Sequence, residues 1–362
     1  MVLDNIKSQI LDIIDIDLGK SLKELNALKA FEINDDGKLF IQLELVPPIQ
    51  LIEGEIRDKI ANIINGIQNN LEWELQIDEL KIPLSPRRFL KEVKHIVAVA
   101  AGKGGVGKSA VASNLAASLA STGAKVGLID GDIYGPSQPT IWGMKDAKLP
   151  AMPAPDGSTI VFPAEKFGIK IASMGFLMKE NEAAIVRGPI LASYLQMLIE
   201  QIEWGELDFL VFDLPPGTGD IQLTLTQQTP LTGAVIVTTP QEISVVDVRR
   251  SVKMFEKVKV PVLGVIENMS YFIPDDAPEK RYYIFGQGGG RRIAQESNVP
   301  FLGEIPLLQK FRETNDNGLP FVLSDEAGNY ATQIHEIVGK IVAEIRKLNY
   351  QKVNTTELTI AL

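Results

Sequence analysis

Cysteine is absent from the 362 residues of this chain, and histidine occurs only as His95 and His335. A disulfide, a zinc–thiolate centre and a thiolate-ligated iron–sulfur site all need cysteine sulfur, so the chain can build none of them from its own residues. Two histidines also argue against a multi-histidine metal centre within one chain. The sequence therefore offers no ligands for an Fe–S cluster.

Long apolar runs are also missing. No run approaches the roughly 20 residues of a membrane-spanning helix, and residues 1–5 lack the basic segment of a signal peptide. The 36 basic and 46 acidic residues give a net charge of −10, which argues against broad binding to nucleic acid or anionic lipid. We therefore expect a cytoplasmic protein with no membrane or nucleic-acid partner, and the length predicts two units.

The glycine-rich stretch Gly102–Ser109 matches the phosphate-binding pattern G-x-x-x-x-G-K-[ST]. It follows the apolar run 96–100 and leads into the helix-like segment 110–120, which is the order that a phosphate cradle needs. Lys108 would reach the terminal phosphates of ATP or GTP, and the Ser109 hydroxyl would bind Mg²⁺. The main chain around the phosphates would belong to Gly102, Lys103, Gly104, Gly105, Val106 and Gly107.

A second lysine, Lys103, directly follows the first glycine of this loop. The sequence K-G-G-V-G-K-S resembles the deviant Walker A loop of the group that contains MinD, ParA, the nitrogenase iron protein and Mrp/Nbp35 proteins. The resemblance implies a homodimer in which Lys103 reaches the nucleotide of the partner subunit. The alternative is a solvated loop lysine.

Three aspartates follow buried runs: Asp130 and Asp132 come after residues 125–129, and Asp213 ends residues 208–213. Carboxylates at the carboxyl end of a strand are placed to act on metal-bound or attacking water, although turn aspartates are the alternative. As a Walker B residue, Asp213 would hold Mg²⁺ through water. The motif D-G-D-I-Y-G-P-S from Asp130 resembles Mrp/Nbp35 proteins rather than MinD or ParA. The resemblance implies that Asp132 polarises the attacking water and that Asp130 lies near Mg²⁺.

Three further segments carry functional hypotheses. Residues 214–220 combine stiff prolines with permissive glycines, which suits a switch that responds to the γ-phosphate. Asn268 ends an apolar run and by resemblance contacts adenine, while turn chemistry is the alternative. Arg187 lies in V-R-G-P, which resembles a family signature, and a surface structural role is the alternative.

Residues 1–85 predict a small α/β unit. A helix is expected at 6–14, a hairpin at 31–45, a helix at 51–67 and a strand at 73–77. The order resembles the MIP18 (DUF59) domain, a module tied to iron–sulfur assembly that often carries a cysteine near the position of Pro47-Pro48. Because this chain has none, docking is the role we expect. A linker at 86–94, an ATPase domain at 95–348 and a tail at 349–362 complete the predicted order.

Residues 271–286 depart from the family that the chain resembles. The corresponding loop of iron–sulfur carriers holds a Cys-x-x-Cys pair that binds a cluster between two subunits, and here that pair is missing. Asp275, Asp276 and Glu279 could hold a hard cation, whereas an exposed acidic loop is the common alternative. Gly288–Gly290 is interpreted as a turn rather than a phosphate site.

Strands and helices alternate from residue 95 onward, which predicts an α/β fold with a mostly parallel sheet. With the resemblance of the loop, the expected fold is a deviant Walker A P-loop NTPase together with the small N-terminal α/β unit. The resemblance implies a slow, Mg²⁺-dependent ATPase of the Mrp/Nbp35 family of iron–sulfur cluster carriers, with apo-client proteins as partners. The alternative is a partner-docking nucleotide switch of MinD or ParA type that carries no metal.

Overall fold

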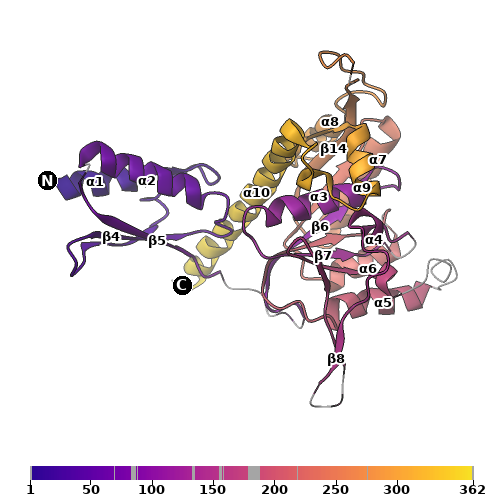
Figure 1. Cartoon of the computed structure of the whole chain (residues 1–362), viewed down its shortest axis with the longest axis horizontal. Helices are drawn as coiled ribbons and strands as arrows, with labels where there is room; N and C mark the ends of the chain where they lie inside the picture. Colours follow the sequence, from indigo (N-terminus) through magenta and orange to yellow (C-terminus); the bar gives the residue numbers. More distant parts are fainter. Residues whose placement is uncertain are drawn as a thin grey trace. The chain divides into compact units, whose positions relative to one another are not determined.

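The computed structural model (Figure 1) forms two units, one from residues 1–85 and 342–362 and the other from residues 86–341. We call them the first and the second unit. The structure describes residues 2–68, 70–82, 87, 89–132, 135–154, 157, 159–177, 188–217, 219–274 and 276–360. Of the helices described there, none has a stretch that is both long and apolar enough to span a bilayer.

The second unit is built on an eight-stranded sheet in which every neighbouring pair except β10–β11 is parallel. In spatial order the strands are β10 (Ala164–Lys166), β11 (Ile169–Ser173), β7 (Val126–Asp130), β12 (Leu207–Asp213), β6 (Val93–Ala100), β13 (Gly233–Thr238), β14 (Val262–Phe272) and β15 (Phe301–Leu307). A separate small hairpin pairs β8 (Ala151–Pro153) with β9 (Thr159–Val161). The predicted α/β class and mostly parallel sheet are confirmed.

Helices connect these strands and cover the sheet. They are α3 (Lys108–Ala120), α4 (Gln138–Ile141), α5 (Gly188–Glu200), α6 (Asp220–Gln228), α7 (Glu242–Lys257), α8 (Gly289–Glu296), α9 (Gln309–Asp316) and α10 (Gly328–Ile360). The central strands are continuous apolar runs because both of their faces are covered, as parallel sheets require. Helix α3 packs against β12 and β7, while α7 packs against β13 and β14.

The strand register brings three chain segments to one edge of the sheet. Asp213 of β12 pairs with Val99 of β6 on one side and with Asp130 of β7 on the other. All three strands are parallel, so the loops that follow them leave from the same edge. The predicted phosphate-binding loop and the predicted acidic residues therefore meet there.

The first unit packs two helices on a three-stranded sheet. Its elements are α1 (Val2–Leu11), β1 (Ile14–Asp15), β2 (Lys20–Ser21), β3 (Leu28–Ile33), β4 (Leu39–Leu45), α2 (Glu53–Ile67) and β5 (Trp73–Glu79). Strand β4 buries every second side chain, and α2 buries Ile56, Ile60 and Ile64 against it. The predicted hairpin and central helix are confirmed, whereas the likeness to a MIP18 domain stays a prediction.

The predicted tail at 349–362 is wrong in the part that the structure describes, because α10 continues to Ile360. Residues from Val342 onward belong to the first unit. There the fully buried Arg346 guanidinium donates to Asp15 in a bidentate pair (2.9 and 2.5 Å) and to Asp17 (2.6 Å). The first strand of the second unit also begins before the predicted residue 95, since β6 begins at Val93.

We expect Arg346→Ala to lower the free energy of unfolding by about 3–5 kcal/mol, because it leaves the buried Asp15 carboxylate without its cation. Urea unfolding followed by circular dichroism would measure the loss. Lys347→Ala is the matched control, since that neighbouring lysine is exposed and forms a surface pair with Glu344. Equal stability of the two variants would show that the buried pair does not hold this unit together.

Candidate functional site

The predicted phosphate-binding loop joins the end of β6 to the start of α3. Gly105 and Gly107 have φ values of 82° and 79°, a backbone region that side chains rarely adopt. At Gly102 the constraint is space, because a Cβ atom would overlap Asp247 of α7. Main-chain conformation and packing thus both require glycine in this loop, and the N-terminus of α3 points its amide groups toward it.

Lys108 lies at the centre of the site. Its side chain is only 6% exposed, and its ammonium pairs with the fully buried carboxylate of Asp213. The same Nζ atom lies 3.2 Å from the Ser109 hydroxyl. The structure therefore brings together the predicted Walker A lysine, the predicted Mg²⁺-binding serine and the predicted Walker B aspartate.

Asp130 is a second fully buried carboxylate beside this pair. Burial and the charge of Asp213 raise its pKa to about 7. Hydrogen bonds from the Ser173 hydroxyl (2.9 Å) and the main-chain nitrogen of Gln138 (3.1 Å) oppose that rise. One lysine thus faces two buried acids, an arrangement that an additional cation would stabilise.

Gln138, the first residue of α4, is a site residue that the sequence analysis did not identify. Its fully buried amide donates to Asp213 (2.9 Å) and to the main-chain oxygen of Ser109 (3.1 Å). Its carbonyl oxygen accepts from Ser113 and from the Trp142 indole. Gln138 therefore holds the loop and the Walker B carboxylate in register. The available signal was its position, directly after the D-G-D-I-Y-G-P-S motif.

Asn268 also contacts the phosphate-binding loop. Its Nδ2 donates to the Val106 carbonyl at 2.8 Å, and a Cβ atom on Gly107 would overlap the same amide. The side chain is 5% exposed. Asn268 therefore fixes the main chain of the loop, a role that its predicted contact with adenine did not include.

A cavity of about 290 Å³ opens beside the loop. One wall is Gly107 and Ala110 at the start of α3, and another is α9. The α9 wall consists of Phe311, Arg312, Asn315 and Asp316. The other lining residues are mostly apolar and are Ile141, Asn268, Met269, Pro306, Leu307 and Leu308. A flat, mostly apolar group attached to bound phosphates would fit this place.

The remaining predicted site residues have different outcomes. Lys103 is half-buried, and within the described part of the chain no hydrogen bond or ion pair joins it to another residue. The main-chain nitrogen of Asp132 donates to Asp130 at 3.2 Å. Gly217 of the predicted switch donates to the carbonyl of Ala101 at 2.9 Å, which ties the switch to the loop. Arg187 and Asp275 lie outside the described residues.

Residues 271–286 are the segment that lacks the cysteine pair of the family. Within it, Phe272 and Tyr282 form two main-chain hydrogen bonds of 2.8 and 2.9 Å. Tyr282, Tyr283 and Ile284 are exposed, and Asp276 and Glu279 are on its exposed part. Across the described residues, no group of three or more His, Cys, Asp or Glu gathers as metal ligands. The described part of this loop therefore presents surface side chains.

The glycine turn before α8 has its own buried anion. The main-chain nitrogen of Gly290 donates to the Glu267 carboxylate at 2.5 Å, and burial raises the pKa of Glu267. The Glu267 carboxyl group thus takes up the free amide at the N-terminus of α8. The interpretation of Gly288–Gly290 as a turn agrees with this contact.

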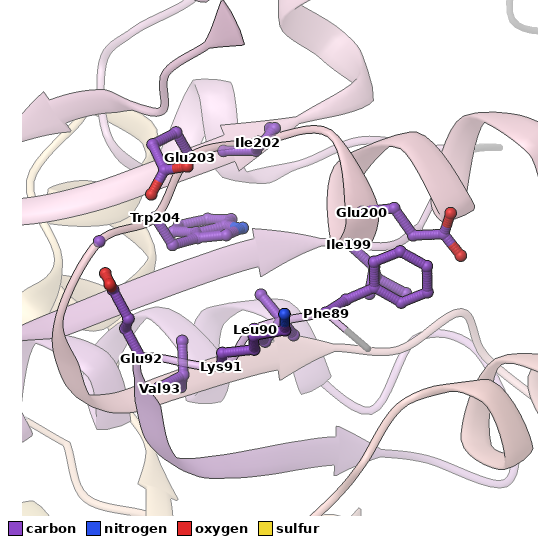
Figure 2. Close-up of a pocket in the computed structure, with 11 residues that line it drawn as sticks. Phe89, Leu90, Lys91, Glu92, Val93, Ile199, Glu200, Ile202, Glu203 and Trp204 are labelled. Atoms are coloured by element: carbon purple, nitrogen blue, oxygen red, sulfur yellow. The ribbon is translucent and has the colours of Figure 1, made fainter. Parts of the chain in front are cut away.

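A second cavity, of about 250 Å³, lies at the amino-terminal ends of the strands, opposite the ends that carry Asp130 and Asp213. Figure 2 shows the side chains that line it. It is lined by Val93 at the start of β6, by Phe89 and Leu90 before it, and by Ile199 and Trp204. Ligands of parallel α/β sheets bind outside the carboxyl ends of the strands. This cavity is at the amino ends, so it is separate from the site around Lys108.

Comparisons with known proteins agree with this geometry. The model of a family described as ParA, NUBPL iron-transfer P-loop NTPase, matches residues 92–342. The chain is 43% identical over 334 residues to an iron-sulfur cluster carrier protein of Synechocystis, which covers 91% of this chain and 94% of that protein. It is 39% identical over 349 residues to the chloroplastic Fe-S cluster assembly factor HCF101 of Arabidopsis thaliana, covering 94% of this chain and 63% of that protein.

A solved structure shows the same fold. The nucleotide-binding protein of Archaeoglobus fulgidus, in complex with ADP, is 36% identical and superimposes with a TM-score of 0.56. The match covers 64% of this chain and 89% of that protein.

Proposed function

This chain belongs to the NUBPL iron-transfer P-loop NTPase family of ParA type, and we propose that it binds and slowly hydrolyses ATP with Mg²⁺ in order to support iron–sulfur assembly on other proteins. The observation that carries the nucleotide chemistry is the buried contact of Lys108 with Asp213 and Ser109 at the start of α3. A relative of high coverage is named an iron-sulfur cluster carrier protein. The cytoplasm stays the compartment that we expect.

The residues at this site fit Mg²⁺. The Ser109 hydroxyl and the carboxylates of Asp130 and Asp213 are hard oxygen ligands, the kind that Mg²⁺ prefers together with water and substrate phosphates. The raised pKa of Asp130 shows that ionising this buried acid beside Asp213 is costly, and a cation bound there would offset that cost. When bound, Mg²⁺ would neutralise charge on the β- and γ-phosphates.

We assign the remaining steps to residues of the chain. Lys108 and the main-chain amides of the loop bind the phosphates, and Asp132 orients a water molecule. The water oxygen bonds to the γ-phosphorus while the bond from that phosphorus to the bridging oxygen breaks, and the water releases a proton to a phosphate oxygen, so the products are ADP and inorganic phosphate. Lys103 of one subunit reaches the nucleotide of the other in a homodimer. Gln138 keeps Asp213 and the loop aligned.

The cluster is cargo that this chain does not hold by itself. The sequence has no cysteine, and carboxylates such as Asp276 and Glu279 are hard ligands that suit iron–sulfur irons poorly. We propose that ATP drives contact with a cysteine-bearing partner, docked on the first unit. The missing cysteine pair favours a second candidate as well, a nucleotide switch that docks a partner and takes no part in metal transfer.

Anaerobic reconstitution with iron and sulfide, followed by desalting, tests the cargo assignment. We expect the purified homodimer to retain no stable cluster by absorbance and iron analysis. Retention of about four irons and four sulfides per dimer, with transfer to an apo-acceptor, would restore a direct carrier role. Cluster transfer from a loaded donor to an apo-acceptor separates the two candidates. Acceleration by this chain with ATP supports assembly, and an unchanged rate supports the switch.

A further inference from the structure

We propose that the open face of the sheet in the first unit docks an arginine-bearing segment of a partner protein, an inference that rests on the proposed docking of a partner on this unit. The open face is the side of the sheet opposite α1 and α2 (Figure 1). Its side chains come from alternate positions of the three strands. They are Ala30 and Glu32 of β3, Phe40, Gln42 and Glu44 of β4, and Glu74, Gln76 and Asp78 of β5.

The strand register aligns these side chains in rows across the sheet. Phe40 pairs with Glu32 on one side and with Glu74 on the other. Its neighbours along β4, Leu39 and Ile41, are fully buried in the core beneath the helices. Phe40 itself is half-buried, and both glutamates are exposed. The open face therefore presents an aromatic ring between two exposed carboxyl groups.

The acidic side chains of the open face outnumber the cations that this chain supplies to them. Glu44 is paired with Lys29 at 3.3 Å. For Glu32 and Glu74, no ion pair joins either side chain to a cation within the described residues. Two of the acids are thus available to a cation from outside the chain.

Asp78 is a third acid of the open face, and amide groups rather than a cation hold it in place. Its carboxylate accepts from Gln42 at 2.8 Å and from Gln76 at 2.9 Å. These hydrogen bonds hold the pKa of Asp78 below its usual range. The carboxylate therefore stays charged near neutral pH and adds to the negative potential of the face.

Geometry and charge together select a basic protein segment as the occupant. Two strand spacings, about 10 Å, separate Glu32 from Glu74, so the two acids do not converge on one metal ion. Nucleic acid, an anionic membrane and a second copy of this face would each bring negative charge to it. A ring flanked by carboxylates instead suits side chains that join an apolar stem to a positive head.

Arginine meets these requirements better than lysine. Its planar guanidinium can stack on the Phe40 ring and donate two N–H groups to one carboxylate, whereas the lysine ammonium is a compact and more strongly hydrated charge. Alternate residues of an extended segment lie about 7 Å apart on one side, so two arginines with flexible stems reach both Glu32 and Glu74. The occupant is therefore an extended segment with arginine at alternate positions.

The first test measures peptide binding to the full chain without nucleotide. The probe is a dye-labelled peptide of alternating arginine and threonine, and fluorescence anisotropy at low salt compares it with a lysine–threonine peptide of the same length. We expect the arginine peptide to bind about threefold tighter, and the affinity of both peptides to fall as salt rises. Equal affinities, or no binding of either peptide at millimolar concentration, would overturn the proposal.

Two double variants test where the peptide binds. Glu32→Gln with Glu74→Gln should weaken binding of the arginine peptide about tenfold, because two ion pairs are lost. Asp12→Asn with Asp58→Asn removes the same charge from exposed positions next to α1 and in α2, and should keep the affinity within about twofold. Equal weakening in the two variants would show attraction to the net charge of the chain alone and would refute the assignment to the open face.

A third variant tests the aromatic contact. Phe40→Leu keeps an apolar side chain on the open face but removes the ring, so the arginine and lysine peptides should then bind equally. A preference for arginine that persists in this variant would contradict the contact with Phe40.

Calorimetry with ATP on the same preparations distinguishes this proposal from the proposed function. The open face belongs to the first unit and the site around Lys108 to the second, so the variants should bind ATP as the unmodified chain does. Binding of ATP without binding of the peptide would reject the docking surface alone. Binding of the peptide without binding of ATP would reject the proposed ATPase function alone.

Discussion

Lys108→Ala is expected to weaken ATP binding by roughly 100-fold or more. Charge-assisted hydrogen bonds are worth about 1.5–3 kcal/mol each, and Lys108 would make them to the terminal phosphates of the nucleotide. The side chain is buried between the loop and Asp213, so no other cation of the described site can take its place. Isothermal titration calorimetry at fixed Mg²⁺ measures the change directly.

The same substitution should alter the protonation of the site. Lys108 opposes the rise of the Asp130 pKa, which is about 7 with the lysine present. Without the ammonium, Asp130 and Asp213 face each other with no cation, so the pKa of Asp130 should rise further. Asp130 would then stay protonated to a higher pH, and Mg²⁺ binding at the site would have to offset the larger cost of ionising it. The ATP affinity of the variant should therefore fall more at low Mg²⁺ than at saturating Mg²⁺.

Lys103→Ala is the matched control, because it removes the same type of side chain from the same loop. Lys103 is half-buried and does not contact Asp213, so its removal should leave the affinity for ATP within a few-fold of the original value. Unchanged binding by the Lys108→Ala chain would show that the phosphates do not bind at this loop.

The phosphate-binding loop could be predicted because its requirements are local in sequence. Gly105 and Gly107 need positive φ, Lys108 and Ser109 follow at fixed spacing, and the flanking apolar run and helix complete the pattern. Asp130 and Asp213 were also predictable, since each ends a buried strand and parallel strands end at one edge. Strand order itself could not be derived, because pairings such as β6 with β13 depend on packing far along the chain.

Gln138 was missed because its role depends on contacts between distant segments. Gln138 lies 75 residues from the Asp213 carboxylate that it holds, and its position directly after the D-G-D-I-Y-G-P-S motif does not reveal that contact. Arg346 was missed for the same reason, because its buried partners are near the opposite end of the chain.

Lys103→Ala is expected to reduce ATP turnover by on the order of 1,000-fold while sparing ATP binding. A reduction of this size is the lower end of the range for a catalytic cation that a partner subunit supplies. A lysine that has no partner among the described residues of its own subunit is available for such a contact. Its charge would neutralise the γ-phosphoryl group only in the transition state, when the second subunit closes over the nucleotide. Single-turnover hydrolysis with saturating ATP measures this effect separately from binding.

Mixing two inactive chains tests whether the lysine acts across the dimer. A Lys103→Ala subunit keeps Asp132, and an Asp132→Ala subunit keeps Lys103. If Lys103 acts across the dimer, the nucleotide site of the Lys103→Ala subunit has its own Asp132 and receives Lys103 from its partner, so one site of each heterodimer is complete. If Lys103 acts on the partner's nucleotide, the mixture should recover up to about half of the original activity per heterodimer. If it acts within its own subunit, each site of the heterodimer still lacks one residue. A mixture no more active than either parent, with subunit exchange demonstrated by differently tagged chains, would therefore place Lys103 on its own nucleotide.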